Sequence, residues 1–442
     1  MLSLCIPAFA ASKLLIPMDL AQRDHLKAYG IAYWTVKQGG KAQWLLNYRC
    51  GSFLCDDYEQ LERLCRLRGV TYELVDGAET ARIYAEIENS NMEAVPLEKA
   101  PKIAVYAPDW YQPWDDAVLL ALTYAEIPYD LIYDDEVLRG KLVEYDWLHL
   151  HHEDFTGQMG KFYRSYKNSP WYQEHTARDK ERARQWGFPS VSELKKAVAR
   201  EIKSYVKGGG FLFAMCSGTD TFDIALAAEG VDIVDVPFDG TPPDPDAQKK
   251  LDYSKCLAFT NFKLIFDPNV YEFSDIDMTR ESGRGYRGEE GDYFTLFEFS
   301  AKYDPVPTML TQCHTSVIKG FIGQTTSFRR LLVKPSVVVM GEYVGRDEVK
   351  YIHGNFGKGF WTFYGGHDPE DYRHLVGDPP TNLELHKNSP GYRLILNNVL
   401  FPAARKKKLK TWRGCAAESI IFMLTRSAKR IWAHQGTRNT GI

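Results

Sequence analysis

The sequence is poor in cysteine and contains no Cys-x-x-Cys pair. Eight cysteines in 442 residues are too sparse for a disulfide scaffold, and the lack of paired cysteines argues against a structural zinc site. Cys50 and Cys55 are close enough in sequence to close a small disulfide loop in an oxidising compartment, or they remain two free thiols. We therefore expect an ordinary hydrophobic core rather than one held by cross-links or metal.

No segment reaches the ~18 uninterrupted apolar residues that a membrane-spanning helix requires. An apolar run at residues 2–11 ends in Ala8-Phe9-Ala10, the small-x-small pattern that precedes a signal-peptidase cut, although no basic residue comes before it. A buried first strand is the alternative. We expect residues 1–11 to be the remnant of a signal peptide and the protein to be exported to the periplasm or cell envelope.

The chain also lacks an excess of positive charge. Lys+Arg 54 against Asp+Glu 58 gives a net charge of −4, which excludes a broad cationic surface for nucleic acid. The charge is uneven, because residues 405–442 hold ten Lys or Arg and one Glu (net +9), which leaves −4 − 9 = −13 for the rest. We expect an acidic globular body with a basic tail and no nucleic-acid partner.

A small α/β module is predicted for residues 12–97. Two β-runs, at residues 30–36 and 42–48, flank a Gly-Gly turn, and residues 58–68 carry leucines at helical spacing before a glycine. Nothing in this region has a catalytic signature. We expect the function to lie in the larger domain that follows.

Residues 98–404 alternate between strand and helix patterns. Apolar runs predict strands at residues 102–107, 129–133, 146–152, 211–215, 231–234, 337–340, 349–352 and 359–364. Helical patterns lie at residues 114–126, 191–207, 221–229 and 392–401. Insertions interrupt the scheme at about 155–190 and 239–300. This alternation predicts a doubly wound, mainly parallel sheet covered on both faces, with its site at the carboxyl ends of the strands.

Residues 208–218, GGGFLFAMCSG, carry the sharpest functional signal. A buried strand delivers Cys216 into a tight turn, and a helix follows directly, which is the layout of a nucleophile elbow. The amide end of that helix favours the thiolate, and Gly218 lets the backbone bend closely. The alternative is a small core residue at a strand end, because cysteine is often buried.

A second feature is a histidine at the end of a late strand. His367 follows Gly-Gly after the strand predicted at residues 359–364, so we expect it at the same sheet edge as Cys216. Asp368 and Glu370 are near enough in sequence to orient its imidazole, and a base aligned by a carboxylate is what a thiol nucleophile requires. The alternative is a turn histidine that is satisfied by its own neighbours.

The order of these motifs resembles the class I glutamine-amidotransferase-like superfamily, and within it the flavodoxin-like ThuA-type branch, over about residues 100–404. The family's elbow is usually Gly-x-Cys-x-Gly, and Ala214 stands here in place of the first glycine. The family's His-x-Glu has one extra residue here, between His367 and Glu370. The resemblance implies a flavodoxin-like fold and a Cys–His amidase or glutaminase-type hydrolase that acts on an amide or ester carbonyl.

Up to Thr411 the chain also resembles exported proteins, mostly from the Bacteroidetes, that are labelled asparagine synthetase B; residues 148–157 and 364–372 carry this likeness. Genuine asparagine synthetase has an N-terminal cysteine and a Ser-Gly-Gly-x-Asp-Ser loop for ATP. The nearest match, residues 217–221, has its aspartate one place early. We therefore take the name as a family label, expect no ATP-dependent asparagine synthesis, and expect no cofactor.

A third polar cluster ends the strand predicted at residues 146–152. On a strand His149 and His151 share one face and could ligate zinc. Alternatively, they are polar side chains that occupy the end of the sheet without a specific function. In the amidotransferase-like fold this strand end supplies oxyanion donors. We assign oxyanion or substrate contacts, and no metal, to these residues: Ser217, Gly218, Gly157, Gln158, His151 and His152.

Tryptophan and tyrosine crowd the expected edge of the site. They are Trp110, Tyr111, Trp114, Tyr163, Tyr166, Trp171 and Tyr172. Flat aromatic rings stack on sugars, although such residues more often belong to the core. The alternative function is therefore a non-catalytic, carbohydrate-binding ThuA-like protein, and in either case the partner is a small-molecule or glycan substrate.

Overall fold

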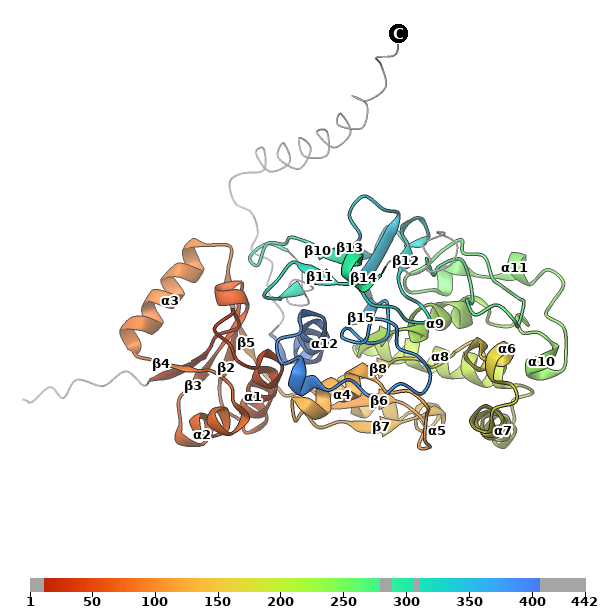
Figure 1. The fold of residues 1–442 in the computed structure, drawn as a ribbon, viewed down its shortest axis with the longest axis horizontal. Coiled ribbons are helices and arrows are strands. Elements are labelled where there is room, and N and C mark those ends of the chain that lie inside the picture. The colour runs from red at the N-terminus through yellow and green to blue at the C-terminus, as the bar shows by residue number, and fades with distance from the viewer. Residues whose placement is uncertain (1–11, 279–287, 305–310, 406–442) are drawn as a thin grey trace, which may run out of the picture. The chain divides into compact units, whose positions relative to one another are not determined.

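The structure is a computed structural model that describes residues 12–278, 288–304 and 311–405 (Figure 1). Two β-sheets with flanking helices organise this part of the chain, so the prediction of an α/β protein is confirmed. Within these ranges no helix is both long and apolar enough to cross a membrane. The predicted signal-peptide remnant and the basic tail after Arg405 lie outside the described residues.

The N-terminal sheet is antiparallel throughout and has the strand order β4–β1–β3–β2–β5. Its strands are β1 (Lys13–Ile16), β2 (Ala42–Leu46), β3 (Ser52–Asp56), β4 (Glu73–Val75) and β5 (Glu93–Leu97). Its helices are α1 (His25–Lys37), α2 (Glu59–Arg68) and α3 (Gly77–Asn89). The strand and helix predicted at residues 42–48 and 58–68 are confirmed, and Cys50 and Cys55 are free thiols.

The strand predicted at residues 30–36 is wrong, because this segment lies in α1. Its β-branched and aromatic residues favour a strand in isolation, but Asp24 caps a helix by accepting the Lys27 N–H at 2.9 Å. Nearly every residue of α1 is buried, and the helix also packs on α4 (Ala117–Tyr124) and α12 (Pro390–Leu400). A helix buried on all sides has no apolar stripe for the sequence to reveal.

One half of the larger sheet is parallel, with the strand order β7–β6–β8–β9–β15. These strands are β6 (Ile103–Tyr106), β7 (Asp130–Ile132), β8 (Trp147–Leu150), β9 (Phe211–Met215) and β15 (Gly359–Tyr364). All five are predicted from the sequence. Because the strands are parallel, their carboxyl ends meet at one edge of the sheet.

The other half is antiparallel, which corrects the prediction of a mainly parallel sheet. The order continues from β15 as β14–β13–β10–β11, and β12 pairs with β14, so five antiparallel pairings face four parallel ones. The strands are β10 (Tyr293–Leu296), β11 (Val317–Lys319), β12 (Phe328–Arg329), β13 (Val338–Glu342) and β14 (Glu348–Phe356). The first three have at most four residues, too few for a pattern of alternation to be recognised.

Helices cover both faces of the parallel half (Figure 1). Successive strand residues point to opposite faces: Val105 packs in one apolar cluster with α4 and α12, whereas Ala104 packs in another with α8 (Val191–Gly208) and α9 (Ser217–Ala227). Both faces of these strands are therefore buried. This explains why the strands are continuous apolar runs in the sequence.

Local signals predict some boundaries and miss others in this domain. Ser190 accepts the Glu193 N–H at 3.2 Å and caps α8. The strand predicted at residues 231–234 is wrong, because this buried segment is irregular. Helix α7 (Pro170–Gln185) fills the first insertion and was not predicted, since only two of its residues are buried and it has no apolar stripe.

His353, on β14, is a buried histidine with no charged neighbour. Its Nδ1 lies 2.8 Å from Thr362 Oγ1, and its ring contacts those of Phe211, Phe360 and Phe401. Burial lowers the pKa of His353 to about 3, whereas an unfolded histidine takes up a proton near pH 6.5. Below pH 6.5 the unfolded state therefore binds more protons than the folded state. The contribution of neutral His353 to the free energy of unfolding is complete above pH 6.5 and is lost as pH falls toward 3.

We expect His353 alone to remove about 2 kcal/mol of unfolding free energy between pH 7 and pH 5. The His353→Gln variant cannot take up that proton but still offers an amide to Thr362. Its unfolding free energy, measured by urea titration at pH 7, 6 and 5, should therefore fall less steeply than that of the wild type. Parallel pH profiles for the two proteins would contradict this assignment.

Candidate active site

Four parallel strands end at one edge, and the segment after each brings a polar side chain to the same place. These are Asp115 after β6, His151 after β8, Cys216 after β9 and His367 after β15. The structure brings together the two residues that the sequence predicts to meet, because the His367 ring lies close enough to the Cys216 side chain for that side chain to raise the pKa of His367. Both line one cleft of about 910 Å³, counted to its open mouth.

Cys216 occupies the turn between β9 and α9. Its backbone φ of 48° is unusual for a residue with a side chain and costs about 1–3 kcal/mol, which is common at functional sites. Its N–H donates to the Gly366 carbonyl at 3.1 Å, which ties the turn to the segment that carries His367. Helix α9 begins at the next residue, Ser217, so its amide end lies beside the thiol.

Gly218 lets this turn approach the end of β8. Its N–H donates to the His151 carbonyl at 2.7 Å, and a Cβ at this position would lie 2.6 Å from the same oxygen. Because this amide is already used, Gly218 does not provide the predicted oxyanion donor. The Ser217 amide, at the first position of α9, forms no hydrogen bond within the described residues and is free for that role.

His367 is buried and bonded on both sides. Its Nε2 lies 3.0 Å from the Asp115 carbonyl oxygen and 3.8 Å from Asp115 Oδ1, and its Nδ1 lies 3.1 Å from His151 Nε2. Burial lowers the pKa of His367, but its interactions with Asp115 and Cys216 outweigh burial and raise this pKa to about 10. The ring is therefore protonated at neutral pH.

A chain of hydrogen bonds continues from His367 into the core. His151 Nδ1 lies 3.2 Å from Asp116 Oδ1 and 3.2 Å from His149 Nε2, and His149 Nδ1 lies 3.0 Å from the Phe213 carbonyl. Burial lowers the pKa of His151 to about 4, so His151 is neutral at neutral pH. Its Nε2 therefore accepts the hydrogen bond that the N–H of His367 Nδ1 donates. This chain fixes the orientation of the His367 ring.

Asp368 and Glu370, which the sequence predicts to orient His367, have other partners. Asp368 caps the turn that follows it and accepts the Tyr392 hydroxyl at 2.8 Å. Glu370 Oε2 lies 3.0 Å from His386 Nδ1. The chain turns directly after His367, which points these carboxylates away from its ring, and the carboxylate beside the ring comes instead from the segment after β6.

Gly157 and Gln158, predicted as oxyanion donors, do not line the cleft that holds Cys216. Their loop wraps around the carboxylate of Asp154, which accepts two backbone N–H groups of the same loop at 2.7 and 3.1 Å. Gly157 lines a second cavity instead. His152 lines both cavities and stands between them.

The backbone amide that faces the sulfur comes from a residue that the sequence did not single out. The Gln324 N–H donates to Cys216 Sγ at 3.3 Å, and the Gln324 side chain is held by the Gly160 carbonyl at 2.6 Å. The Gln324 and Ser217 amides are thus the donors available near the sulfur. Apolar and aromatic side chains form much of the remaining wall: Trp114, Phe162, Tyr166, Tyr271, Ile322, Leu375 and Val376.

Three sets of side chains have donor atoms close enough together to hold a metal ion. In each set these atoms lie within 4.8 Å of one another: His151, His152 and His367; Asp115, His367 and His374; Asp116, His149 and His151. Every set contains His151 or His367, whose ring nitrogens already form the hydrogen bonds described above. A metal would have to displace these bonds, so the arrangement suits proton transfer better than metal binding.

Besides Gln324, three residues of this site were missed in the sequence. Asp115 and Asp116 follow the first parallel strand, so the rule that placed Cys216 and His367 could have found them, but they appeared to belong to the helix predicted at residues 114–126. In the structure Asp116 caps α4 instead. His374 stacks on His367 with ring centroids 3.7 Å apart, and no motif marks it.

No family model and no curated protein matches the chain. Among solved structures, a cytoplasmic protein from Salmonella typhimurium is similar over 69% of this chain and 100% of its own, with 11% identity and a TM-score of 0.33. A second cytoplasmic protein, from Salmonella typhimurium LT2, covers the same shares with 13% identity and a TM-score of 0.33. Similarity at this level assigns neither a fold nor a function to this chain.

Proposed function

We propose that this chain is a cysteine-dependent hydrolase or amidotransferase that acts on an amide or ester carbonyl. The observation that carries the proposal is the proximity of a protonated His367 to the Cys216 side chain in one cleft. Buried structural cysteines have no imidazolium beside them, whereas nucleophilic cysteines do. The strained turn that carries Cys216 agrees with this role.

The order of the parallel strands supports a flavodoxin-like assignment. Numbered along the chain within the parallel half, β7–β6–β8–β9–β15 reads 2-1-3-4-5, which is the flavodoxin-like order. We propose on this basis, and on the elbow cysteine and late histidine, that the domain is related to the class I glutamine-amidotransferase-like superfamily and its ThuA-type branch. The antiparallel half would then be an addition to that core.

In the proposed reaction the Cys216 thiolate attacks the carbonyl carbon, and a carbon–sulfur bond forms. The imidazolium of His367 gives its proton to the leaving nitrogen or oxygen as the carbonyl carbon's bond to that atom breaks. In the second step water, or an acceptor amine, attacks the carbonyl carbon of the thioester and gives a proton to neutral His367. The carbon–sulfur bond then breaks and releases the Cys216 thiolate. The Ser217 and Gln324 amides are positioned to stabilise the oxyanion of each tetrahedral intermediate.

We expect iodoacetamide to alkylate Cys216 at least about tenfold faster than Cys55 or Cys65 at neutral pH. Burial raises the pKa of both of these thiols to about 12, so neither forms a thiolate under these conditions. Peptide mass spectrometry over a time course measures each rate. The Cys216→Ala variant should lose the fast-labelled fraction, and the control Cys256→Ala, at a buried cysteine outside the cleft, should keep it.

A reactive ester gives a second readout of the same proposal. With 4-nitrophenyl acetate the wild type should release one nitrophenolate per chain in a rapid burst as the thioester forms. Cys216→Ala should show no burst. Labelling of Cys216 at the slow rate of Cys55, together with no burst from the wild type, would overturn the proposed function.

A further inference from the structure

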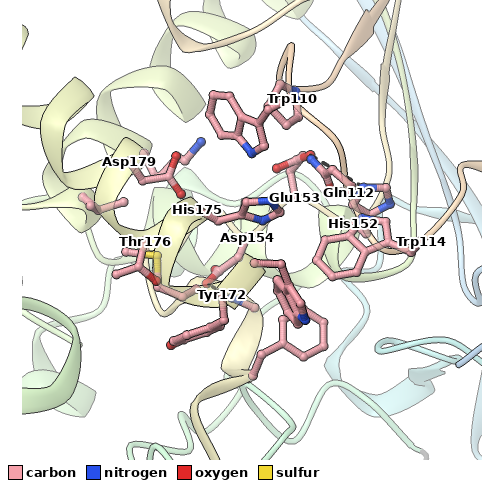
Figure 2. A pocket seen from close by; sticks show the side chains of 18 of the residues that line it. Trp110, Gln112, Trp114, His152, Glu153, Asp154, Tyr172, His175, Thr176 and Asp179 are labelled. Carbon is pink, nitrogen blue, oxygen red and sulfur yellow. Dashed lines mark hydrogen bonds and ion pairs between the residues drawn. The ribbon is translucent and has the colours of Figure 1, made fainter. Parts of the chain in front are cut away.

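A second cavity lies beside the cleft of Cys216 and shares three wall residues with it, Trp114, His152 and Phe162. The volume of this cavity is about 580 Å³, including the space up to its opening. The segments after β6 and β8 form one side, and α7 with the start of α8 forms the other. Figure 2 shows polar and aromatic side chains from these elements turned toward a common space. The role proposed for Cys216 does not use this cavity.

Aromatic rings make up much of its wall. They are Trp110, Trp114, Tyr133, Phe162, Trp171 and Tyr172, with the imidazoles of His152 and His175. Neighbouring rings meet at steep angles, 90° between Trp114 and Trp171 and 83° between Trp110 and Tyr133. Such a wall presents ring faces from several directions. It can surround a compact group, whereas a sugar ring requires one exposed flat platform.

Three acidic side chains line this cavity, and in the described part of the chain none forms an ion pair with Lys or Arg. Asp154 is held by the backbone amides of its own loop, whereas Glu153 and Asp179 lack such partners. Glu153 is 8% exposed, and its contacts are a 3.5 Å hydrogen bond from Gln112 Nε2 and a 3.8 Å approach to His152 Nε2. Asp179 forms no hydrogen bond or ion pair with any described residue, and its Oδ1 is buried. In the view of Figure 2 these two carboxylates lie on either side of His175.

The cations nearest to these carboxylates are engaged elsewhere. Lys195 Nζ lies 3.0 Å from both carboxylate oxygens of Asp134 and also bonds the hydroxyls of Tyr106 and Tyr133 at 2.9 and 3.0 Å. Arg182 lies 3.6 Å from Asp135 and stacks over the rings of Trp110 and Tyr133. The wall therefore holds more acidic groups than cationic ones.

The raised pKa values of Glu153 and Asp179 are consistent with a site that lacks a bound cation. Burial raises the pKa of Glu153 to about 8 and that of Asp179 to about 6, and Lys195 only partly opposes this. Burial also lowers the pKa of His175, whose Nε2 lies 3.0 Å from the Tyr111 carbonyl, so His175 adds no positive charge. An enclosed carboxylate without a counter-ion is costly, and a bound cation would relieve that cost.

We propose that this cavity binds a small organic cation, an ammonium or guanidinium group, held by the Glu153 and Asp179 carboxylates and surrounded by the tryptophan and tyrosine rings. Cation–π attraction and two carboxylates act on the same ligand charge. A metal ion fits less well, because neither carboxylate belongs to a set of three donors within 4.8 Å in the described part of the chain.

Titration of the full-length protein with butylammonium, tetramethylammonium and ethylguanidinium tests the proposal, with tryptophan fluorescence and calorimetry as readouts. At least one of these cations should bind, and butanol, of the same length but uncharged, should bind about tenfold more weakly or not at all. Glu153→Gln and Asp179→Asn should each weaken binding by a similar factor. The control Glu174→Gln, on the exposed side of α7 and outside the cavity, should leave binding unchanged.

Cys216→Ala should also bind the cation as the wild type does, which separates this proposal from the cysteine chemistry. Circular dichroism spectra of the variants check that each is folded, and Trp171→Ala gives a further test of the aromatic wall. Equal binding of butanol and butylammonium, binding of methyl glucoside in place of the cations, or no binding of any of the three cations would overturn the proposal.

Discussion

Replacing His367 with glutamine should slow acylation of Cys216 by about 10²–10⁴-fold, the range for loss of a positioned general acid–base. The imidazolium lies beside the Cys216 side chain, and in the proposed reaction it is also the proton donor for the leaving group. Glutamine keeps a hydrogen-bonding side chain there but carries neither the charge nor the proton. Burst rates with 4-nitrophenyl acetate and iodoacetamide labelling rates measure the effect.

His386→Gln is the matched control for this substitution. His386 pairs with Glu370 and does not line the cleft, so its replacement should leave both rates close to those of the wild type. Thermal unfolding of both variants checks that the fold is intact. A folded His367→Gln protein that reacts at the wild-type rate would show that the histidine has no part in the chemistry.

Lys195→Met should destabilise the protein by about 3–5 kcal/mol, because it leaves a buried carboxylate without its counter-ion. Lys195 is 3% exposed and Asp134 is fully buried, and the two are joined by contacts of 3.0 Å to both carboxylate oxygens. Methionine has a similar length and fills the space without the charge. Urea unfolding measured at pH 7 gives the free-energy difference.

Two further variants test the cause of this loss. Lys207→Met, at an exposed position of the same helix, should stay within about 0.5 kcal/mol of the wild type. Adding Asp134→Asn to Lys195→Met removes the uncompensated charge and should recover part of the lost stability. A Lys195→Met protein as stable as the wild type would contradict the importance of this pair.

The parallel half of the larger sheet could be predicted because its strands are buried on both faces. Residues such as Ala104 and Val105 face opposite helical layers, and this double burial produces continuous apolar runs bounded by turn residues. The antiparallel half could not be predicted as well, since β12 has only Phe328 and Arg329. Pairings of that length depend on contacts between distant segments rather than on local pattern.

The candidate site could be predicted in part for a similar reason. Cys216 and His367 each follow a recognisable strand directly, so the rule that parallel strands share a carboxyl edge placed them together. The partners of His367 could not be assigned from proximity in sequence. Asp368 is adjacent but turns toward Tyr392, while Asp115, more than two hundred residues away, lies against the ring.

The position of β15 between β9 and β14 affects how the chain matures during synthesis. β9 ends at Met215, but its neighbour β15 begins at Gly359, so the ribosome must make all the intervening residues before the two strands can pair. Until then one side of β9 is an unprotected edge, which is a site for association with other nascent chains. The carbonyl of Gly366, which accepts the Cys216 N–H, belongs to the same late segment, so the Cys216 turn acquires its geometry only when this segment joins the sheet.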